Sequence, residues 1–355
     1  MAGERGAAYR QWLAERTTAV VGLARSGVAA ARLIRRLGGR VLASDSGARE
    51  SLSAEARNLE HLGCALWTGG HPDAAFAGAD LVVVSPGVPL ELPALEAARA
   101  RGVPVIGELE LGWRVMAADL IAITGTNGKT TTTALTGELV GGTVRPLLVG
   151  GNIGTPLCAH ALGFPADGLV VAEVSSFQLD TTELLRPRVA AVLNVTPDHL
   201  DRHKTFERYV EAKSRIFANQ TPADCAVLNA DDPVAASLAP RTRARVLWFS
   251  RLTPLDHGVF VRDAWIVAKL NGHVEEICPL GEIPLRGQHN VENVLAAAAC
   301  ALWAGLSPES IRRGIGAFRG VAHRIERVLD ERGVTYYNDS KGTNVASTIK
   351  ALESF

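Results

Sequence analysis

Short apolar runs alternate with amphipathic stretches along most of this sequence, and this alternation limits the available folds more than any other feature. Strand-like runs separated by helix-like stretches predict parallel β-sheets covered by helices. Polar residues follow each strand-like run at once. Because ligands bind beyond the carboxyl ends of strands in open parallel sheets, these polar residues predict a shared crevice. Three central runs are continuously apolar, as strands buried on both faces are: GLVVAEV (168–174), VAAVLNV (189–195) and DCAVLNA (224–230).

The length of the chain predicts more than one domain, because 355 residues exceed the roughly 100–200 residues of an ordinary domain. Residues 1–107 predict a small Rossmann-like domain. Residues 108–320 predict a central domain with a mostly parallel sheet. Residues 321–355 predict a strand, a turn, a second strand, a polar loop and the start of a helix. This last segment is too short for an α/β domain, so we expect a truncated third domain with an exposed, aggregation-prone sheet edge.

Composition excludes several classes of protein. The chain has 37 basic and 37 acidic residues, and this balance argues against a broad nucleic-acid surface. Its five cysteines form no CxxC pair, which argues against a local zinc or redox motif and favours scattered buried thiols. We find no signal-peptide core and no apolar stretch of the roughly 20 residues that cross a bilayer. We therefore expect a cytoplasmic protein that binds neither nucleic acid nor membrane.

The stretch TGTNGKTTTT (124–133) lies between a strand-like and a helix-like run. One interpretation is an ordinary strand-to-helix turn, where Gly and Asn are common. The other is a phosphate site, in which Gly125 and Gly128 let the backbone approach an anion, Lys129 reaches the terminal phosphates and Thr130 binds Mg²⁺. The usual phosphate-binding loop (P-loop) has its first glycine at the position of Ile123, so the spacing is shorter than usual.

Acidic and histidine residues follow two of the buried strands. Glu173 ends one strand, where an acid is either a magnesium ligand, as in other NTPases, or a surface carboxylate. Asp198, His199 and Asp201 follow the next strand, in NVTPDHLDRH. This cluster falls where the crevice is expected.

The stretch TFERYVEAKSRIF (205–217) predicts a helix with Thr205 as its N-cap. Lys213 borders the apolar stripe of this helix. The residues alone favour a lysine that extends to the surface over one that points inward. The apolar stripe is formed by Tyr209, Ala212, Ile216 and Phe217.

The N-terminal stretch GLARSG (22–27), followed by Asp45, imitates a dinucleotide-binding fingerprint. However, Ala24 replaces the middle glycine that lets a pyrophosphate lie against the backbone. NAD binding is therefore disfavoured, and Asp45 taken alone is better explained as an acid in a turn after a strand.

Several motifs in this order resemble the Mur ligase family, which also includes folylpolyglutamate synthase. GTNGKT is similar to the short P-loop G-[ST]-x-G-K-[ST] of that family. SSFQL (175–179) is the most discriminating string and is similar to the branch that adds D-glutamate. The resemblance runs from GLARSG to the last residue. The remaining motifs that carry it are GGNIGTPL, EVSSFQLD, NVTPDHLDRH, YVEAK, GQHNVEN, HRIE and NDSKGTN.

The resemblance implies an ATP-dependent ligase of peptidoglycan precursor synthesis. Its substrates would be UDP-N-acetylmuramoyl-L-alanine, D-glutamate and ATP, and the reaction would pass through an acyl phosphate. It also implies two Mg²⁺ sites, carbamylation of Lys213, and a monomer. A carbamate would turn the Lys213 ammonium into an anionic metal ligand.

The resemblance also assigns the binding residues. The expected metal ligands are Thr130, Glu173, His199 and Lys213 as a carbamate. The expected catalytic residues are Lys129, Glu173, His199, Lys213 and Lys341, and Lys341 and Thr343 would face the incoming amino acid. The expected ATP contacts are Gly125, Thr126, Asn127, Gly128, Lys129, Thr130, Thr131, Asn290, Asn293, Arg324 and Asp339. The expected contacts to the uridine-nucleotide substrate are Ala24, Arg25, Ser26, Asp45, Ser46, Ser85, Gly87, Asn152 and Ser175.

Two alternatives stay open from the sequence. One is a sister ligase of the same family with another substrate, which SSFQL and the N-terminal domain disfavour. The other is a fragment that binds ATP and a UDP-sugar but turns over poorly, because the resemblance implies a longer C-terminal domain with further amino-acid contacts.

Overall fold

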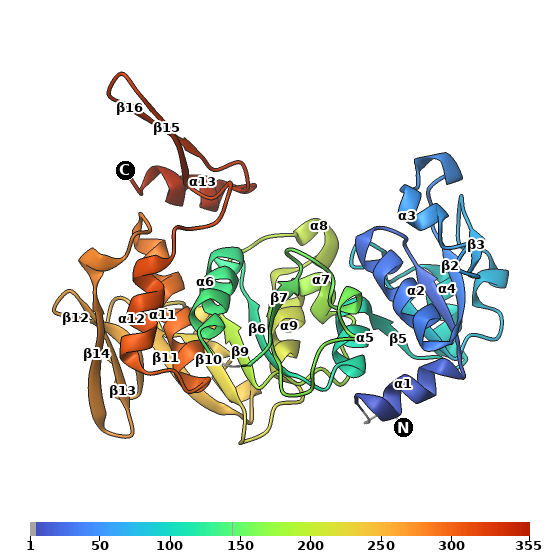
Figure 1. The fold of residues 1–355 in the computed structure, drawn as a ribbon, viewed down its shortest axis with the longest axis horizontal. Helices are drawn as coiled ribbons and strands as arrows, with labels where there is room; N and C mark the ends of the chain where they lie inside the picture. Colours follow the sequence, from blue (N-terminus) through green and yellow to red (C-terminus); the bar gives the residue numbers. More distant parts are fainter. Residues whose placement is uncertain (1–4, 144) are drawn as a thin grey trace. The chain divides into compact units, whose positions relative to one another are not determined.

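The computed structural model describes residues 5–143 and 145–355 and confirms the predicted α/β class (Figure 1). The described residues divide into two compact units. The first unit draws on three stretches of the chain, within Met1–Asp119, Gly150–Gly168 and Ser175–Leu185. The second unit holds the described residues of the rest. The predicted boundaries at residues 107 and 320 remain predictions.

The first unit contains a parallel five-stranded sheet in the order β3-β2-β1-β4-β5. The strand order reverses at β1, which has β2 on one side and the later strand β4 on the other. Ligands bind at such a reversal, beyond the carboxyl ends of the strands. The strands are β1 (Thr17–Val21), β2 (Arg40–Ser44), β3 (Ala65–Trp67), β4 (Leu81–Val84) and β5 (Val105–Gly107).

Helix α2 (Arg25–Leu37) packs on β1, β2 and β4 and contacts two further helices of this unit, α1 and α5. Its apolar face is buried, and it ends where Gly38 adopts the left-handed conformation, with φ of 98°. Arg35 and Arg36 in the last turn complement the helix dipole. The other helices of this unit are α1 (Ala7–Ala14), α3 (Ala54–Arg57), α4 (Pro93–Ala100), α5 (Glu108–Val115) and α7 (Ser176–Leu179).

The second unit is built on the nine-stranded sheet, in the order β14-β13-β12-β11-β10-β9-β6-β8-β7. The continuously apolar strands β8, β9 and β10 are fully buried, as predicted. The order reverses at β6, which lies between β9 and β8, so the stretch that follows β6 is again at a ligand-binding position. The strands are β6 (Asp119–Thr124), β7 (Leu147–Gly151), β8 (Leu169–Glu173), β9 (Val189–Val192), β10 (Cys225–Asn229), β11 (Arg245–Ser250), β12 (Gly258–Arg262), β13 (Trp265–Leu270) and β14 (His273–Pro279).

Strand β12 pairs parallel with β11, whereas β13 and β14 add antiparallel pairs, so the sheet is mixed and agrees with the mostly parallel sheet that the sequence predicted. Asn271 and Gly272 connect β13 to β14 and both have positive φ, of 52° and 82°. Asn-Gly between apolar runs is a hairpin signal, because both turn residues tolerate that conformation. The dipeptide was therefore the clue to this meander.

Helices α6 (Lys129–Gly141) and α11 (Gln288–Trp303) pack together in the core of the second unit. The alanine-rich middle of α11 is fully buried. No helix within residues 5–143 and 145–355 has the length and apolar character that crossing a bilayer requires. The other helices are α8 (Leu200–His203), α9 (Phe206–Ser214), α10 (Pro233–Ser237) and α12 (Pro308–Ala317).

The last segment forms the predicted strand, turn, strand, loop and helix. Strands β15 (Glu326–Glu331) and β16 (Val334–Asn338) pair only with each other among the described residues, and α13 (Val345–Leu352) follows them (Figure 1). Large apolar side chains of this segment are exposed: Val328, Leu329, Val334, Tyr336, Val345, Ile349, Leu352 and Phe355.

Candidate functional site

The loop between β6 and α6 forms a cradle of backbone groups. Gly128 is the N-cap of α6, with φ of 84°, and it supplies no side-chain cap. The first N–H groups of the helix therefore point toward a ligand position. A Cβ at Gly128 would lie 2.2 Å from Oδ1 of Asn293, so this residue has to be glycine on both counts.

Asn194 holds this loop in place. Its Oδ1 accepts a hydrogen bond from the backbone N–H of Asn127 at 2.8 Å, and its Nδ2 donates to the Asn127 carbonyl at 3.1 Å. Asn194 had no predicted role, although it lies in the same motif as Asp198 and His199. Its signal was an amide at the carboxyl end of a buried strand that neighbours β6.

A chain of hydrogen bonds crosses the start of α6. The Thr130 hydroxyl donates to Oε2 of Glu173 at 2.7 Å and accepts from Nη2 of Arg324 at 3.0 Å. Glu173 is buried, so the alternative of a surface carboxylate is wrong. A carboxylate and a threonine hydroxyl are the hard oxygen donors that Mg²⁺ takes, with waters and phosphates completing the shell. The donor set fits one Mg²⁺.

Two lysines converge beneath the loop on one carbonyl. Nζ of Lys213 donates to the Gly125 oxygen at 2.7 Å, and Nζ of Lys129 donates to the same oxygen at 2.9 Å and to the Thr126 carbonyl at 2.7 Å. Lys213 is only 1% exposed, so the interpretation of a lysine that extends to the surface is wrong. The prediction failed because the interior next to α9 offers a polar partner, the Gly125 carbonyl, and helical periodicity does not reveal such a partner.

Burial lowers the pKa of both amines, because a charged ammonium loses its hydration inside the protein. The pKa of Lys213 falls well below its usual range, and the charge of Lys129 lowers it further. The carboxylates of Asp198 and Glu173 oppose these shifts. Lys213 is therefore a buried amine beside a phosphate-type loop, in surroundings that disfavour its charged form.

His199 lies at the open side of this cluster. Its side chain is 50% exposed and Nε2 lies 3.8 Å from Oδ2 of Asp198. Its ring is 6.4 Å from that of Tyr209, whose face is 4.6 Å from Nζ of Lys213. No group of three or more His, Cys, Asp or Glu side chains in the described parts of the chain is arranged to hold a metal alone. A second metal here would need the carbamate or ligand oxygens.

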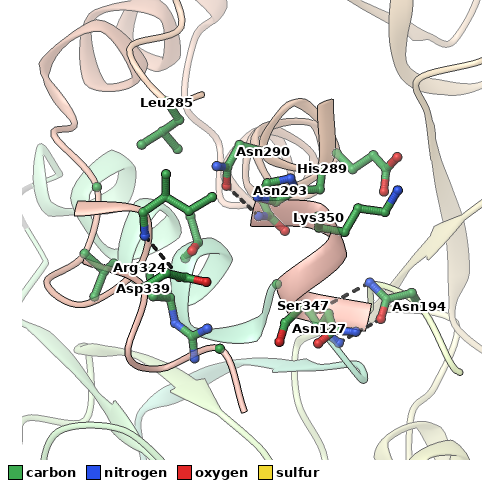
Figure 2. Close-up of a pocket in the computed structure, with 17 residues that line it drawn as sticks. Asn127, Asn194, Leu285, His289, Asn290, Asn293, Arg324, Asp339, Ser347 and Lys350 are labelled. Atoms are coloured by element: carbon green, nitrogen blue, oxygen red, sulfur yellow. Dashed lines mark hydrogen bonds between the residues drawn. The ribbon is translucent and has the colours of Figure 1, made fainter. Parts of the chain in front are cut away.

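A cleft beside the loop collects residues from far apart in the second unit (Figure 2). Figure 2 shows Asn293 donating to Oδ1 of Asn290, at 2.9 Å, across one turn of α11. Seven of the predicted ATP residues line the cleft: Asn127, Gly128, Thr131, Asn290, Asn293, Arg324 and Asp339. Lys341 and Thr343 are exposed and are not among its lining residues. The cleft is also lined by residues for which the sequence predicted no role: Leu285, His289, Ser347 and Lys350.

A separate pocket in the first unit lies beyond the carboxyl ends of β1, β2 and β4. Seven of the predicted uridine-substrate residues line it, whereas Asn152 and Ser175 do not. Both oxygens of the Asp45 carboxylate accept backbone hydrogen bonds, from Leu23 at 2.6 Å and from Gly47 at 2.8 Å. Asp45 thus orders the loop, as expected of a turn acid. The seven are Ala24, Arg25, Ser26, Asp45, Ser46, Ser85 and Gly87.

Comparison with known proteins gives concordant matches for both units. A family model described as the Mur ligase middle domain matches residues 123–301. A second model, described as the N-terminal domain of MurD-like Mur ligases, matches residues 16–107.

Two curated relatives are close in sequence. The UDP-N-acetylmuramoylalanine–D-glutamate ligase of Koribacter versatilis is 49% identical over 336 residues, which cover 95% of this chain and 74% of that protein. The enzyme of the same name from Acidobacterium capsulatum is 50% identical over 338 residues, covering 95% of this chain and 73% of that protein. A solved UDP-N-acetylmuramate–alanine ligase from Thermotoga maritima shares the fold, with a TM-score of 0.59 at 21% identity over 96% of this chain and 77% of that one.

Proposed function

Because the chain belongs to the Mur ligase family, we propose that it joins D-glutamate to UDP-N-acetylmuramoyl-L-alanine in an ATP-dependent reaction. The observation that carries this proposal is the identity of about half the residues, over 95% of the chain, to ligases named for that reaction. The SSFQL string agrees with it. The structure adds a loop, a buried acid and cations in an arrangement that suits phosphoryl transfer.

The reaction needs ATP because a carboxylate and an amine do not condense in water. An oxygen of the L-alanyl carboxylate bonds to the γ-phosphorus of ATP as the bond to ADP breaks. The D-glutamate nitrogen then attacks the acyl carbon, phosphate leaves, and the nitrogen loses its proton. The protein's part is to position the groups and to neutralise charge as it develops.

We assign these roles to residues of the β6 loop and its neighbours. Lys129 would exchange its two carbonyl hydrogen bonds for the transferring phosphate. Thr130 and Glu173 would hold Mg²⁺, which screens the phosphate charge when bound. Arg324, already bonded to Thr130, would reach the same phosphates. The Asn290–Asn293 amides line the cleft where an adenine could lie.

We also propose that Lys213 is carbamylated and takes part, with His199, in a second Mg²⁺ site. Carbamylation forms a bond between a neutral amine nitrogen and the carbon of CO₂, with loss of a proton. The burial that lowers the pKa of Lys213 favours the neutral amine that this step requires. Direct ¹³C NMR of protein equilibrated with ¹³CO₂ tests this: a carbamate resonance is expected and should vanish in Lys213→Ala. Its absence from the unaltered protein would overturn the proposal.

The first unit would hold the uridine nucleotide in the pocket of Arg25, Asp45 and Ser85. Lys341 and Thr343 would serve the incoming amino acid. We propose a monomer in the cytoplasm that acts on small molecules rather than on nucleic acid or membranes. The division into three domains stays a prediction.

The test is phosphate release from Mg-ATP with UDP-N-acetylmuramoyl-L-alanine, with and without D-glutamate, on this 355-residue chain. Release that requires both substrates, with an amide product identified by mass, is expected. Binding of ATP and the uridine substrate without release would favour the alternative of an impaired binding fragment. Release driven by another amino acid in a substrate panel would instead indicate a sister ligase.

A further inference from the structure

His71 lines the first-unit pocket beside the seven predicted residues, although no motif pointed to it. Its Nδ1 lies 2.9 Å from the hydroxyl oxygen of Ser44, at the carboxyl end of β2. Ser44 is 1% exposed, so the imidazole is anchored to the sheet rather than to a mobile surface group. Within the described residues, Nε2 has no hydrogen-bond partner.

The pocket around His71 favours an anion. Helix α2, of 13 residues, begins at this pocket with Arg25. Its N-cap, Ala24, provides no side-chain cap, so the first N–H groups of the helix are available at the end that borders the pocket. Arg25 and Ser26 add donors to the lining. The one carboxylate in the lining, that of Asp45, is bonded to two backbone N–H groups, which offset its charge.

We propose that His71 is a binding residue for the uridine-nucleotide substrate and donates a hydrogen bond from Nε2 to its diphosphate. This inference rests on the proposed function, because it takes a uridine diphosphate as the occupant of the pocket. The neutral ring has a single N–H. With the Ser44 hydroxyl donating to Nδ1, that N–H is on Nε2, the nitrogen with no partner among residues 5–143 and 145–355.

The surroundings of the ring support a neutral imidazole. Burial lowers the pKa of His71, while the nearby Asp45 carboxylate opposes the shift. The uncharged ring is thus favoured, and a Ser44 hydroxyl that donates to Nδ1 leaves the ring proton on Nε2. The neutral ring would donate a hydrogen bond to the phosphates without adding a full charge to the pocket.

Calorimetric binding of UDP and of uridine to four variants tests the proposal. Asn places an amide near the position of Nδ1, whereas Gln reaches the position of Nε2. We expect His71→Ala and His71→Asn to weaken UDP binding about 10-fold, as for loss of a hydrogen bond to a charged group. His71→Gln should keep most of the affinity. Uridine, which has no phosphates, should bind all variants alike, and His61→Ala on the exposed surface serves as the matched control.

The opposite pattern would overturn the proposal. Rescue by Asn and not by Gln would mean that His71 only supports Ser44, and equal loss of uridine and UDP would place the ring at the base. Melting curves of each variant identify any that misfolds. Failure of the proposed function is distinguishable, because then the unaltered protein would not bind UDP at all, whereas failure of this inference leaves that binding intact and insensitive to His71.

Discussion

The loops after β1 and after β6 are two versions of one device. Each follows a strand at which the order of its sheet reverses, and each leads into a 13-residue helix, α2 or α6, that lacks a side-chain N-cap. Each is also fixed by a polar side chain from the end of a neighbouring strand. In the first loop this is the Asp45 carboxylate, and in the second it is the Asn194 amide.

The two anchors differ in charge, and this difference has a physical reason. A carboxylate beside a phosphate site repels the ligand unless its oxygens are paired, and both oxygens of Asp45 are. Asn194 both accepts and donates, so it fixes its loop without adding charge. If the β6 loop holds a triphosphate and the β1 loop a diphosphate, as proposed, the neutral anchor stands beside the more highly charged ligand.

The loops also differ in the reactive groups around them. Lys129, Lys213 and Glu173 surround the β6 loop, whereas the lining of the β1 pocket offers Arg25, His71 and serine hydroxyls. The first set suits bond making and breaking, and the second suits binding. The predictions below test this division.

Lys129→Ala should give the largest effect. If Lys129 faces the transferring phosphate, as proposed, its removal should lower kcat about 10²–10³-fold, the usual loss when a group that stabilises a transition state is removed. UDP binding should be unchanged. Arg25→Ala, in the other loop, should raise KM for the uridine substrate and leave kcat within about twofold, because it removes binding alone. Steady-state kinetics with each substrate varied separates the two outcomes.

Lys269→Ala is the control for this pair, since Lys269 lies on the meander and pairs with Asp256 at the surface. It should leave both kcat and KM unchanged. A fall in kcat for Arg25→Ala as large as that for Lys129→Ala would remove the distinction between a reacting loop and a binding loop.

The sequence predicted much of this comparison, because backbone-level signals are local. The alternation of strands and helices, the Gly128–Lys129–Thr130 turn and the Thr205 cap are all readable from neighbouring residues, and the structure contains each element. The same is true of the strand pair and helix after residue 325. The family was predicted from the resemblance of the motifs to those of Mur ligases.

Residues whose position depends on distant packing were less accessible. Lys213 borders the apolar stripe of its helix, and only the fold shows that Gly125, Lys129 and Glu173 surround it. Asn194 and His71 act through bonds to residues 67 and 27 positions away, respectively, which no local pattern encodes. The predicted roles of Lys341 and Thr343 stay predictions, since both are exposed.

Buried ionisable groups extend the comparison to the pH dependence of the two units. Burial raises the pKa of Glu108 in the first unit from 4.5 to about 7, while the hydrogen bonds from Cys158 oppose the shift. Between those values the folded state keeps a proton that the unfolded state has lost, so the free energy of unfolding falls as pH rises. The loss is up to about 3 kcal/mol and is complete above pH 7. Lys213, with a lowered pKa, acts in the opposite sense in the second unit and destabilises it as pH falls.

Glu108→Gln should remove the first of these slopes. Urea unfolding at pH 5 and pH 8 measures it, with hydrogen exchange of α5 amides to report on the first unit. Glu96→Gln, on the exposed face of α4, is the matched control and should keep the unaltered slope. If the Glu108 variant keeps that slope as well, ionisation of Glu108 is not what destabilises the first unit at high pH.

Exchanging the charges of the two anchors should give the smallest effect and the most specific one. Asn194→Asp removes the donor to the Asn127 carbonyl and adds a negative charge beside the phosphates, so ATP affinity should fall about 10-fold and recover in part at high salt. Asp45→Asn puts an amide N–H against one of the two backbone N–H groups that the carboxylate accepts from. It should weaken UDP binding and lower the free energy of unfolding by about 1–2 kcal/mol. The loss of UDP affinity should not depend on salt. Calorimetry of each ligand at two salt concentrations measures both. The two substitutions are isosteric. Equal salt dependence of the two affinity changes would therefore mean that charge beside the phosphates does not explain why one anchor is Asp and the other Asn.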